Sequence, residues 1–243
     1  MIAPGTIIGR VAELWRYPVQ SMRGERLDSV ELTAAGVLGD RVWGIVDPAL
    51  GQVVSSAQGK RKWRSLVAFG ARTLEDGGLE IALPDGGGVL RGDAPDLDAR
   101  LSAALGQPTH LAHKSRQGLA PPYGHEPIHL LTTATLKELT RLGPQARFMS
   151  ERFRPNLVLD LGAAIGFVEQ GWIGRQLAIG EAVLTLSEDC KRCVMTTLAQ
   201  GDLPQDPLVL AIVNEHNRAH AGVYARVTRP GRLRRGDLGR LLD

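Results

Sequence analysis

Short runs of apolar and β-branched residues, separated by glycine and proline, fill the first third of the chain. Runs at residues 7–15 and 41–47 predict strands, because β-branched residues favour an extended backbone. A third run at 79–83 leads into Pro84-Asp85-Gly86-Gly87-Gly88, whose turn chemistry predicts a hairpin back into residues 89–90. The pattern predicts many short strands in this region.

Three later segments carry apolar residues at helical spacing. They cover residues 96–105, a helix from a capping Thr133 to residue 142, and a helix that begins at Asp206-Pro207. The predicted fold class is therefore mainly β (α+β), with a few helices. Further strands are predicted between and after the helices, at residues 157–161, 176–179, 182–186 and 223–227.

Composition narrows the class of protein further. The 243 residues carry a net charge of +3 and contain 11 aromatic side chains (4 Trp, 3 Tyr and 4 Phe), which disfavours nucleic-acid binding. We expect no membrane span, because no apolar stretch approaches ~20 residues. With no signal peptide evident and only two cysteines, the expected location is the cytoplasm. Charge, glycine and proline cluster at residues 114–125, which marks a weak domain boundary.

The sharpest chemical feature is Cys190-Lys191-Arg192-Cys193. Thiolates are soft metal ligands, and the two flanking cations are expected to lower the cysteine pKa. A structural zinc site needs four ligands, so this motif supplies half, and the pairs His110 with His113 and His216 with His220 are candidates for the rest. From the motif alone, a metal ligand, a redox dithiol and two packed cysteines all stay open.

Three other motifs could bind an anion. They are Phe153-Arg154-Pro155-Asn156, the loop of residues 17–24 around Ser21, and Gly39-Asp40-Arg41. Taken alone, the first two motifs are better explained as an Arg covering a strand start with an Asn in a turn, and as an ordinary turn between strands. Arg41 could equally form a surface ion pair with Asp40 or a neighbour. The arginines of residues 226–235 alternate with apolar residues, which is typical of the solvent face of a strand pair.

The order of these motifs resembles the MOSC family. The series Y-P-V-x-S-x-x-G, G-D-R-x-W, F-R-P-N and C-x-R-C-x-x-T-T runs from near Ile8, and the resemblance continues to Leu242. The family includes the mitochondrial amidoxime-reducing components and bacterial relatives. The resemblance implies an N-terminal β-barrel-like domain at residues 1–115 and a β-rich MOSC domain at residues 116–243, with a cofactor between them.

The resemblance also implies roles for particular residues. Cys193 would bind the molybdenum of a molybdenum cofactor (a Mo-pyranopterin), and Cys190 would not. Ser21 and Arg41 would hold the cofactor phosphate. The full set of implied cofactor-binding residues is Ser21, Arg23, Arg41, Thr132, Thr133, Arg154, Asn156, Arg192, Thr196 and Thr197.

One position departs from the family pattern. Gln20 stands where the amidoxime reducers usually carry lysine, so the phosphate site would lose one cation, and Arg23 is the candidate replacement. The missing cation could also shift the affinity or favour a nucleotide-bearing pterin.

The resemblance implies reduction of small N-hydroxylated molecules. Two cysteines cannot hold a [2Fe–2S] cluster, so electrons would come from a separate flavin, ferredoxin or haem protein. The alternatives are a carrier of molybdenum cofactor, or of sulfur as a persulfide on Cys193, and a structural zinc domain or other non-catalytic binding domain.

Overall fold

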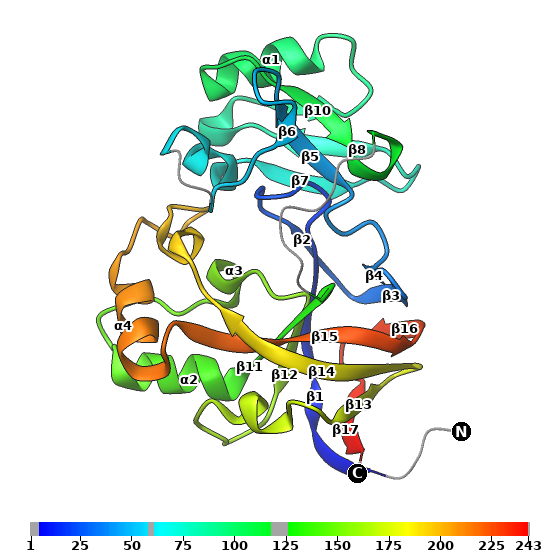
Figure 1. Ribbon diagram of the computed structural model, residues 1–243, viewed down its shortest axis with the longest axis vertical. Helices are drawn as coiled ribbons and strands as arrows, with labels where there is room; N and C mark the ends of the chain where they lie inside the picture. The colour runs from blue at the N-terminus through cyan, green and yellow to red at the C-terminus, as the bar shows by residue number, and fades with distance from the viewer. Residues whose placement is uncertain (1–4, 58–60, 118–125, 243) are drawn as a thin grey trace.

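A closed β-barrel forms the centre of the larger, lower lobe in Figure 1. The computed structural model describes residues 5–57, 61–117 and 126–242. The barrel order is β12-β11-β15-β14-β13-β17-β1, and β1 pairs with β12 to close the ring. Its strands are β1 (Thr6–Arg16), β11 (Ile128–Thr132), β12 (Leu157–Asp160), β13 (Gln176–Ile179), β14 (Ala182–Lys191), β15 (His220–Arg229) and β17 (Leu238–Leu242).

Alternating side chains build the barrel core. Val223 and Ala225 of β15 are fully buried in it, as is Leu14 of β1, while Arg226 faces solvent. Leu233 of β16 (Gly231–Arg234) is buried between two exposed arginines. Arginines of residues 226–235 therefore lie on solvent-facing sides of strands, as their alternation predicts, but β15 and β16 pair with different partners, β14 and β3 (Ser29–Thr33).

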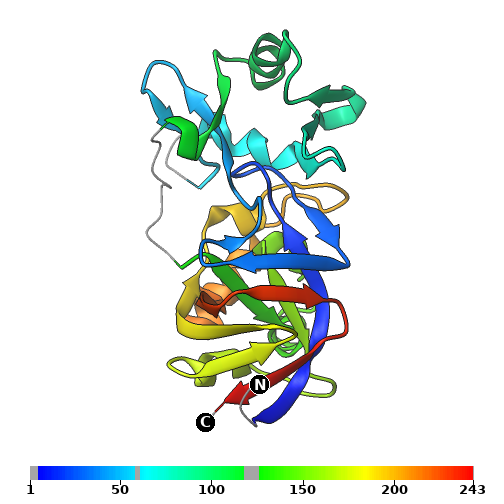
Figure 2. The ribbon, with the colours of Figure 1, turned by 90° about the vertical axis from the view of Figure 1, so that its right-hand side faces the viewer.

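The upper lobe is built from small antiparallel sheets over a second core (Figure 2). One sheet has the order β10-β5-β6, and the other has the order β7-β8-β9, whose β8–β9 hairpin confirms the predicted one. These strands are β5 (Trp43–Asp47), β6 (Gln52–Val53), β7 (Gly70–Thr73), β8 (Leu79–Ala82), β9 (Val89–Arg91) and β10 (His110–His113), accompanied by η1 (Arg61–Ala68), η2 (Pro84–Gly86), α1 (Leu97–Leu105) and η3 (Lys114–Gln117).

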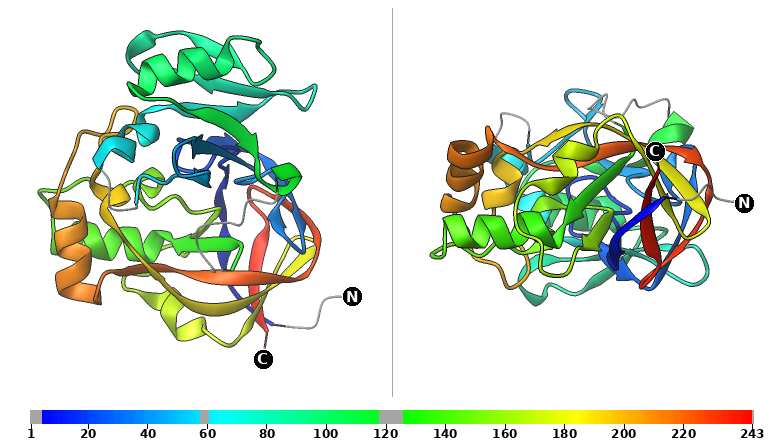
Figure 3. Two further views of the ribbon diagram at one scale, coloured as in Figure 1. Left: turned by 45° about the horizontal axis from the view of Figure 1, so that its top comes forward. Right: turned by 90° about the horizontal axis from the view of Figure 1, so that it is seen from below.

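Helices cover one side of the barrel, where α2 and α4 pack together over a third apolar cluster (Figure 3). The predicted range of α2 is confirmed, but its cap is Thr132, whose hydroxyl accepts from the Thr135 amide at 3.1 Å. His216 lies in α4 and His220 in β15, so the two histidines of this candidate pair do not share one helix. The elements here are α2 (Thr133–Leu142), α3 (Ser150–Phe153), η4 (Val168–Trp172), η5 (Val194–Thr197) and α4 (Leu208–Asn217).

The first 115 residues and the rest of the chain are joined by shared sheets. β1 is a barrel strand, and β3 (Ser29–Thr33) pairs with both β4 (Gly36–Val37) and β16. The short β2 (Glu25–Leu27) extends the barrel sheet beside β1. The division at residues 115 and 116 stays a prediction, and part of its boundary segment, 118–125, lies outside the described residues.

The prediction of a mainly β fold with a barrel and a few helices is confirmed. In the described parts of the chain, every helix is too short or too polar to cross a membrane.

Candidate functional site

The two cysteines of the C-x-x-C motif have opposite environments. Cys190 lies on β14 and is fully buried, whereas Cys193 is exposed. β14 ends at Lys191, and the Arg192 amide donates to the Ala219 carbonyl at 2.6 Å. Cys193 then precedes η5 in an extended conformation. The motif therefore presents one thiol to ligands and keeps the other inside.

Arg192 connects the buried cysteine to the F-R-P-N motif. Its guanidinium donates to the Cys190 sulfur at 2.6 Å and to the carbonyl of Phe153. Burial raises the pKa of the Cys190 thiol, although Arg192 acts in the opposite direction. The expectation that the flanking cations lower the cysteine pKa is therefore wrong for Cys190, because desolvation of the thiolate outweighs the nearby charge.

Two guanidinium groups approach the ring of Tyr17. The Cζ atoms of Arg154 and Arg41 lie 4.3 and 4.9 Å from the ring centroid. The Tyr17 hydroxyl donates to the Pro155 carbonyl at 3.1 Å, and burial raises the pKa of the phenol, which stays neutral. Tyr17 belongs to the predicted loop motif, but sequence reasoning gave it no role because its arginine partners lie elsewhere in the chain.

Three of the predicted binding residues adopt left-handed backbone conformations. The φ angles are 67° at Ser21, 52° at Arg41 and 54° at Arg154. A residue with a Cβ atom pays about 1–3 kcal/mol for such a conformation, and this strain concentrates at functional sites. A positive φ turns the chain away from the direction of a strand or a right-handed helix, and it changes the direction of the side chain at each of these three positions.

Arg154 carries its guanidinium inward from the end of α3. The side chain is 7% exposed and donates to the Met22 carbonyl at 2.7 Å. Burial lowers its pKa to about 10, and the charges of Arg41 and Arg192 act in the same direction. Arg154 therefore stays cationic at neutral pH. We call Arg41, Arg154 and Arg192 the arginine cluster.

Arg41 is held between a carboxylate and the F-R-P-N motif. It forms an ion pair with Asp40, so the local pair considered from the sequence exists. Its guanidinium also reaches Oδ1 of Asn156 at 3.3 Å and the Arg154 carbonyl at 3.4 Å. Asp40 accepts the Tyr17 amide at 2.7 Å, which fixes the loop to the same group.

Asn156 acts as a brace between strands. Its side chain is buried, accepts the His129 amide at 3.2 Å and donates to the Trp15 carbonyl at 3.4 Å. His129 is also buried, and its ring nitrogens lie 3.4 and 3.3 Å from the carbonyls of Arg154 and Ala221. Burial, followed by the charge of Arg192, holds the pKa of His129 well below its usual value, so the imidazole is neutral. In the sequence His129 is a single histidine among apolar residues, and no role was predicted for it.

Ser21 and Arg23 fix the 17–24 loop to the upper lobe. The Ser21 hydroxyl accepts the Ser56 amide at 3.1 Å and lies 3.4 Å from that of Ser55. Arg23 donates to the Ala68 carbonyl at 3.3 Å. The buried Ser55 and Ser56 were not singled out from the sequence, although they place two hydroxyls beside Ser21.

The predicted threonines divide into two groups. Thr196 and Thr197 follow Cys193 in η5, and their hydroxyls donate to the carbonyls of Cys193 and Val194 at 3.0 and 2.8 Å. Thr132 donates to Glu169 at 2.8 Å, and Thr133 donates to Asp160 at 3.1 Å. No hydrogen bond among the described residues joins Thr132 or Thr133 to the arginine cluster, so their cofactor role stays a prediction.

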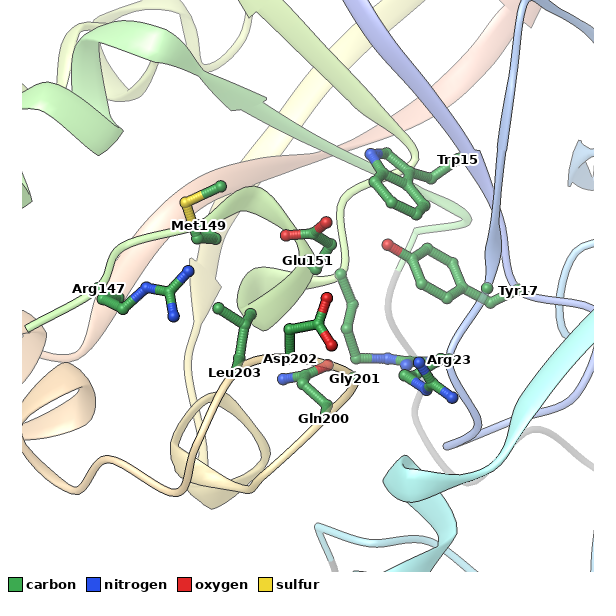
Figure 4. A pocket seen from close by; sticks show the side chains of 12 residues that line it. Trp15, Tyr17, Arg23, Arg147, Met149, Glu151, Gln200, Gly201, Asp202 and Leu203 are labelled. Carbon is green, nitrogen blue, oxygen red and sulfur yellow. The ribbon is translucent and has the colours of Figure 1, made fainter. Parts of the chain in front are cut away.

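A cavity of about 400 Å³ lies beside Tyr17 and Arg154 (Figure 4). Its wall combines the ring of Trp15 with the charged side chains of Arg23 and Asp202, which come from separate segments. The volume is in the range of small-molecule sites.

The site offers many hydrogen-bond donors but no group of side chains arranged as metal ligands among the described residues. Among the described residues, no three His, Cys, Asp or Glu side chains group as metal ligands, so the zinc alternative finds no ligand set. Nε of Arg192 and Nε2 of Gln20 are buried without a hydrogen-bond partner in the described structure. The arrangement can hold an anion on several donors and present one exposed thiol.

Comparison with known families decides the classification. The MOSC domain family matches residues 102–238, and the MOSC N-terminal beta barrel domain matches residues 8–120. The chain belongs to the MOSC family. The resemblance inferred from the ordered motifs is thereby confirmed.

This MOSC protein has curated relatives among amidoxime-reducing components. It is 26% identical to human mitochondrial amidoxime-reducing component 1 over 231 residues, which cover 79% of this chain and 66% of the human protein. It is also 26% identical to rat mitochondrial amidoxime reducing component 2 over 233 residues, 79% of this chain and 67% of the rat protein. The chain thus spans about two thirds of the length of these relatives.

A solved structure shares the fold. The YUAD protein from Bacillus subtilis superimposes with a TM-score of 0.54 at 11% identity, covering 96% of this chain and 94% of that one.

Proposed function

We propose that this MOSC protein binds a molybdenum cofactor through Cys193 and reduces small N-hydroxylated molecules. The observation that carries the proposal is the exposed thiol of Cys193, which directly follows Arg192 in the chain. The guanidinium of Arg192 donates to the carbonyl of Phe153, the residue before Arg154. A thiolate is a soft ligand suited to a transition metal, and the neighbouring guanidiniums suit an anionic group.

The described residues fit such a cofactor. The arginine cluster supplies fixed positive charge, and the unpartnered Nε of Arg192 and Nε2 of Gln20 are buried donors that an anion would satisfy. Cys193 would bind the metal, while Ser21, Arg23, Arg41, Arg154 and Asn156 would hold or orient the pterin and its phosphate. Asn156 does so as a brace, because its amide already links Arg41 to two strands.

The chemistry that the group supplies when bound is two-electron removal of oxygen from nitrogen. In the balanced reaction, an N–OH compound takes up two electrons and two protons, and it yields the N–H compound and water. Amidoximes, hydroxylamines and N-hydroxylated bases are the proposed substrates. The relatives named as amidoxime-reducing components support this choice.

The electrons are proposed to come from a separate redox protein of flavin, ferredoxin or haem type. The chain has two cysteines, one of them buried and bonded to Arg192. A [2Fe–2S] cluster needs four such ligands.

A carrier of molybdenum cofactor or sulfur is the second candidate, because the exposed Cys193 could equally hold a persulfide. Protein purified from a molybdenum-replete host separates the two when benzamidoxime is supplied with a chemically reduced viologen. Molybdenum-loaded protein that converts benzamidoxime to benzamidine supports the reductase. Loaded but inert protein favours the carrier, and protein that never acquires molybdenum contradicts cofactor binding.

A further inference from the structure

Lys114 and Gln20 are neighbours in space although 94 positions separate them in sequence. The Lys114 ammonium donates to Oε1 of Gln20 at 3.2 Å. The backbone at the start of β5 holds both residues: the Lys114 amide donates to the Val42 carbonyl, and the Gln20 amide donates to the Trp43 carbonyl, each at 2.9 Å. The sheet therefore fixes the relative position of the two side chains.

The charge of Lys114 is not neutralised by the protein around it. No carboxylate in the described parts of the chain forms an ion pair with Lys114. The charge of Asp40 raises the pKa of Lys114, but Asp40 itself is paired with Arg41. Burial lowers the pKa of Lys114 to about 8, and the charge of Arg41 contributes in the same direction. An anion at this position would relieve both effects.

Gln20 contributes a second donor. An ammonium group can only donate, so the amide of Gln20 turns its oxygen toward Lys114 and leaves its NH₂ group for another partner. That NH₂ group is buried without a partner in the described structure, and the residue is only 7% exposed. An unsatisfied buried donor is costly, which indicates a ligand that accepts from it.

We propose that Lys114 and the amide of Gln20 form a subsite for the phosphoryl group of the bound cofactor. Ammonium and amide donors held together, with Arg41 near, suit the several acceptor oxygens of a phosphate. The cation that position 20 lacks is thus supplied by residue 114. Lys114 is the described cation that hydrogen-bonds to Gln20, whereas Arg23 donates to the Ala68 carbonyl and lines the cavity of Figure 4. This inference rests on the proposed function for the identity of the ligand.

Retention of the cofactor tests the subsite directly. Wild type, Lys114→Gln and the double variant Gln20→Lys/Lys114→Gln are purified with cofactor, and the loss of molybdenum and pterin during dilution is timed. Lys137→Gln is the matched control, because Lys137 is an exposed lysine on α2. We expect Lys114→Gln to release cofactor about tenfold faster or more. The double variant restores slow release, because it returns an ammonium group to the subsite. Wild-type retention in Lys114→Gln, with an unchanged urea midpoint, overturns the proposal.

Cofactor-free protein separates this inference from the proposed function. Wild type and Lys114→Gln are produced in a host that cannot make the cofactor, and inorganic phosphate is added during thermal unfolding. A phosphate-dependent rise in Tm in wild type that Lys114→Gln lacks supports the subsite, even if the purified protein never contains molybdenum. Equal shifts in the two proteins, including no shift in either, overturn it.

Discussion

The guanidinium of Arg192 donates a 2.6 Å hydrogen bond to the buried sulfur of Cys190. This contact makes the first cysteine of the motif a positioning group for Arg192. The second cysteine, Cys193, is the thiol that faces outward. One short motif thereby supplies both a fixed cation and an accessible ligand.

The two thiols should react at very different rates with an aromatic disulfide reagent such as DTNB. In the native cofactor-free protein we expect one thiol per chain to react quickly, because only Cys193 is exposed. Cys193→Ser should abolish the fast phase, while Cys190→Ser should keep it. In denaturant both thiols of the wild type should react. A fast phase that survives Cys193→Ser would show that the assignment is wrong.

Tyr17 should contribute to stability through its ring more than through its hydroxyl. Tyr17→Phe loses the hydrogen bond to Pro155 and should lower the free energy of unfolding by about 1 kcal/mol. Tyr17→Ala also removes the ring beside Arg41 and Arg154 and should cost about 3–5 kcal/mol. Urea unfolding measures both. Equal losses for the two variants would contradict a structural role for the ring.

Gly222 should be intolerant of any side chain. Its φ is +80°, and a Cβ atom would lie 2.4 Å from Nε2 of His129. Gly222→Ala should therefore cost about 1–2 kcal/mol for the left-handed backbone and about 1–3 kcal/mol more for overpacking. Gly162→Ala is the control, because Gly162 has a φ of +63° with open space around it, so only the first cost applies. Equal destabilisation of the two variants would refute the close approach to His129.

Glu169 should make stability fall as pH rises. Burial raises the pKa of this carboxyl, although Thr132 and Thr135 donate to it. Above pH 4.5, the ordinary pKa of a glutamate, the unfolded state releases a proton that the folded state keeps. The stability that Glu169 contributes is therefore fully present below pH 4.5 and is lost as the pH rises through the pKa of the folded state. Glu169→Gln should flatten this part of the dependence. Urea unfolding between pH 4.5 and 8 measures it, and an identical pH profile for the variant would disprove the assignment.

Local patterns in the sequence predict elements well in this chain and predict their pairing poorly. The spacing of apolar residues predicts the bounds of α2 that the structure has, and the turn residues after β8 predict the hairpin from β8 to β9. The closing pair of the barrel, β1 with β12, joins strands that are far apart in the chain. The apolar and β-branched residues of each segment predict a strand, but they carry no information about which partner each strand will take.

The same limit applies to the candidate site. Cys193 and the arginines were found because their order along the chain resembles a family. Tyr17 and His129 acquire roles through contacts with residues distant in the chain, such as Arg154, which is more than twenty residues from either. Lys114 is the clearest case, because nothing near it in sequence indicates that its ammonium meets Gln20.

Molybdenum content is the most direct test of the central claim, that Cys193 binds the metal of the cofactor. Wild type, Cys193→Ser and Cys190→Ser are purified from one molybdenum-replete host and analysed for molybdenum and pterin per chain. We predict that wild type and Cys190→Ser carry equal molybdenum, while Cys193→Ser loses most of it. Equal loading of Cys193→Ser and wild type, or loss in Cys190→Ser alone, would contradict the account.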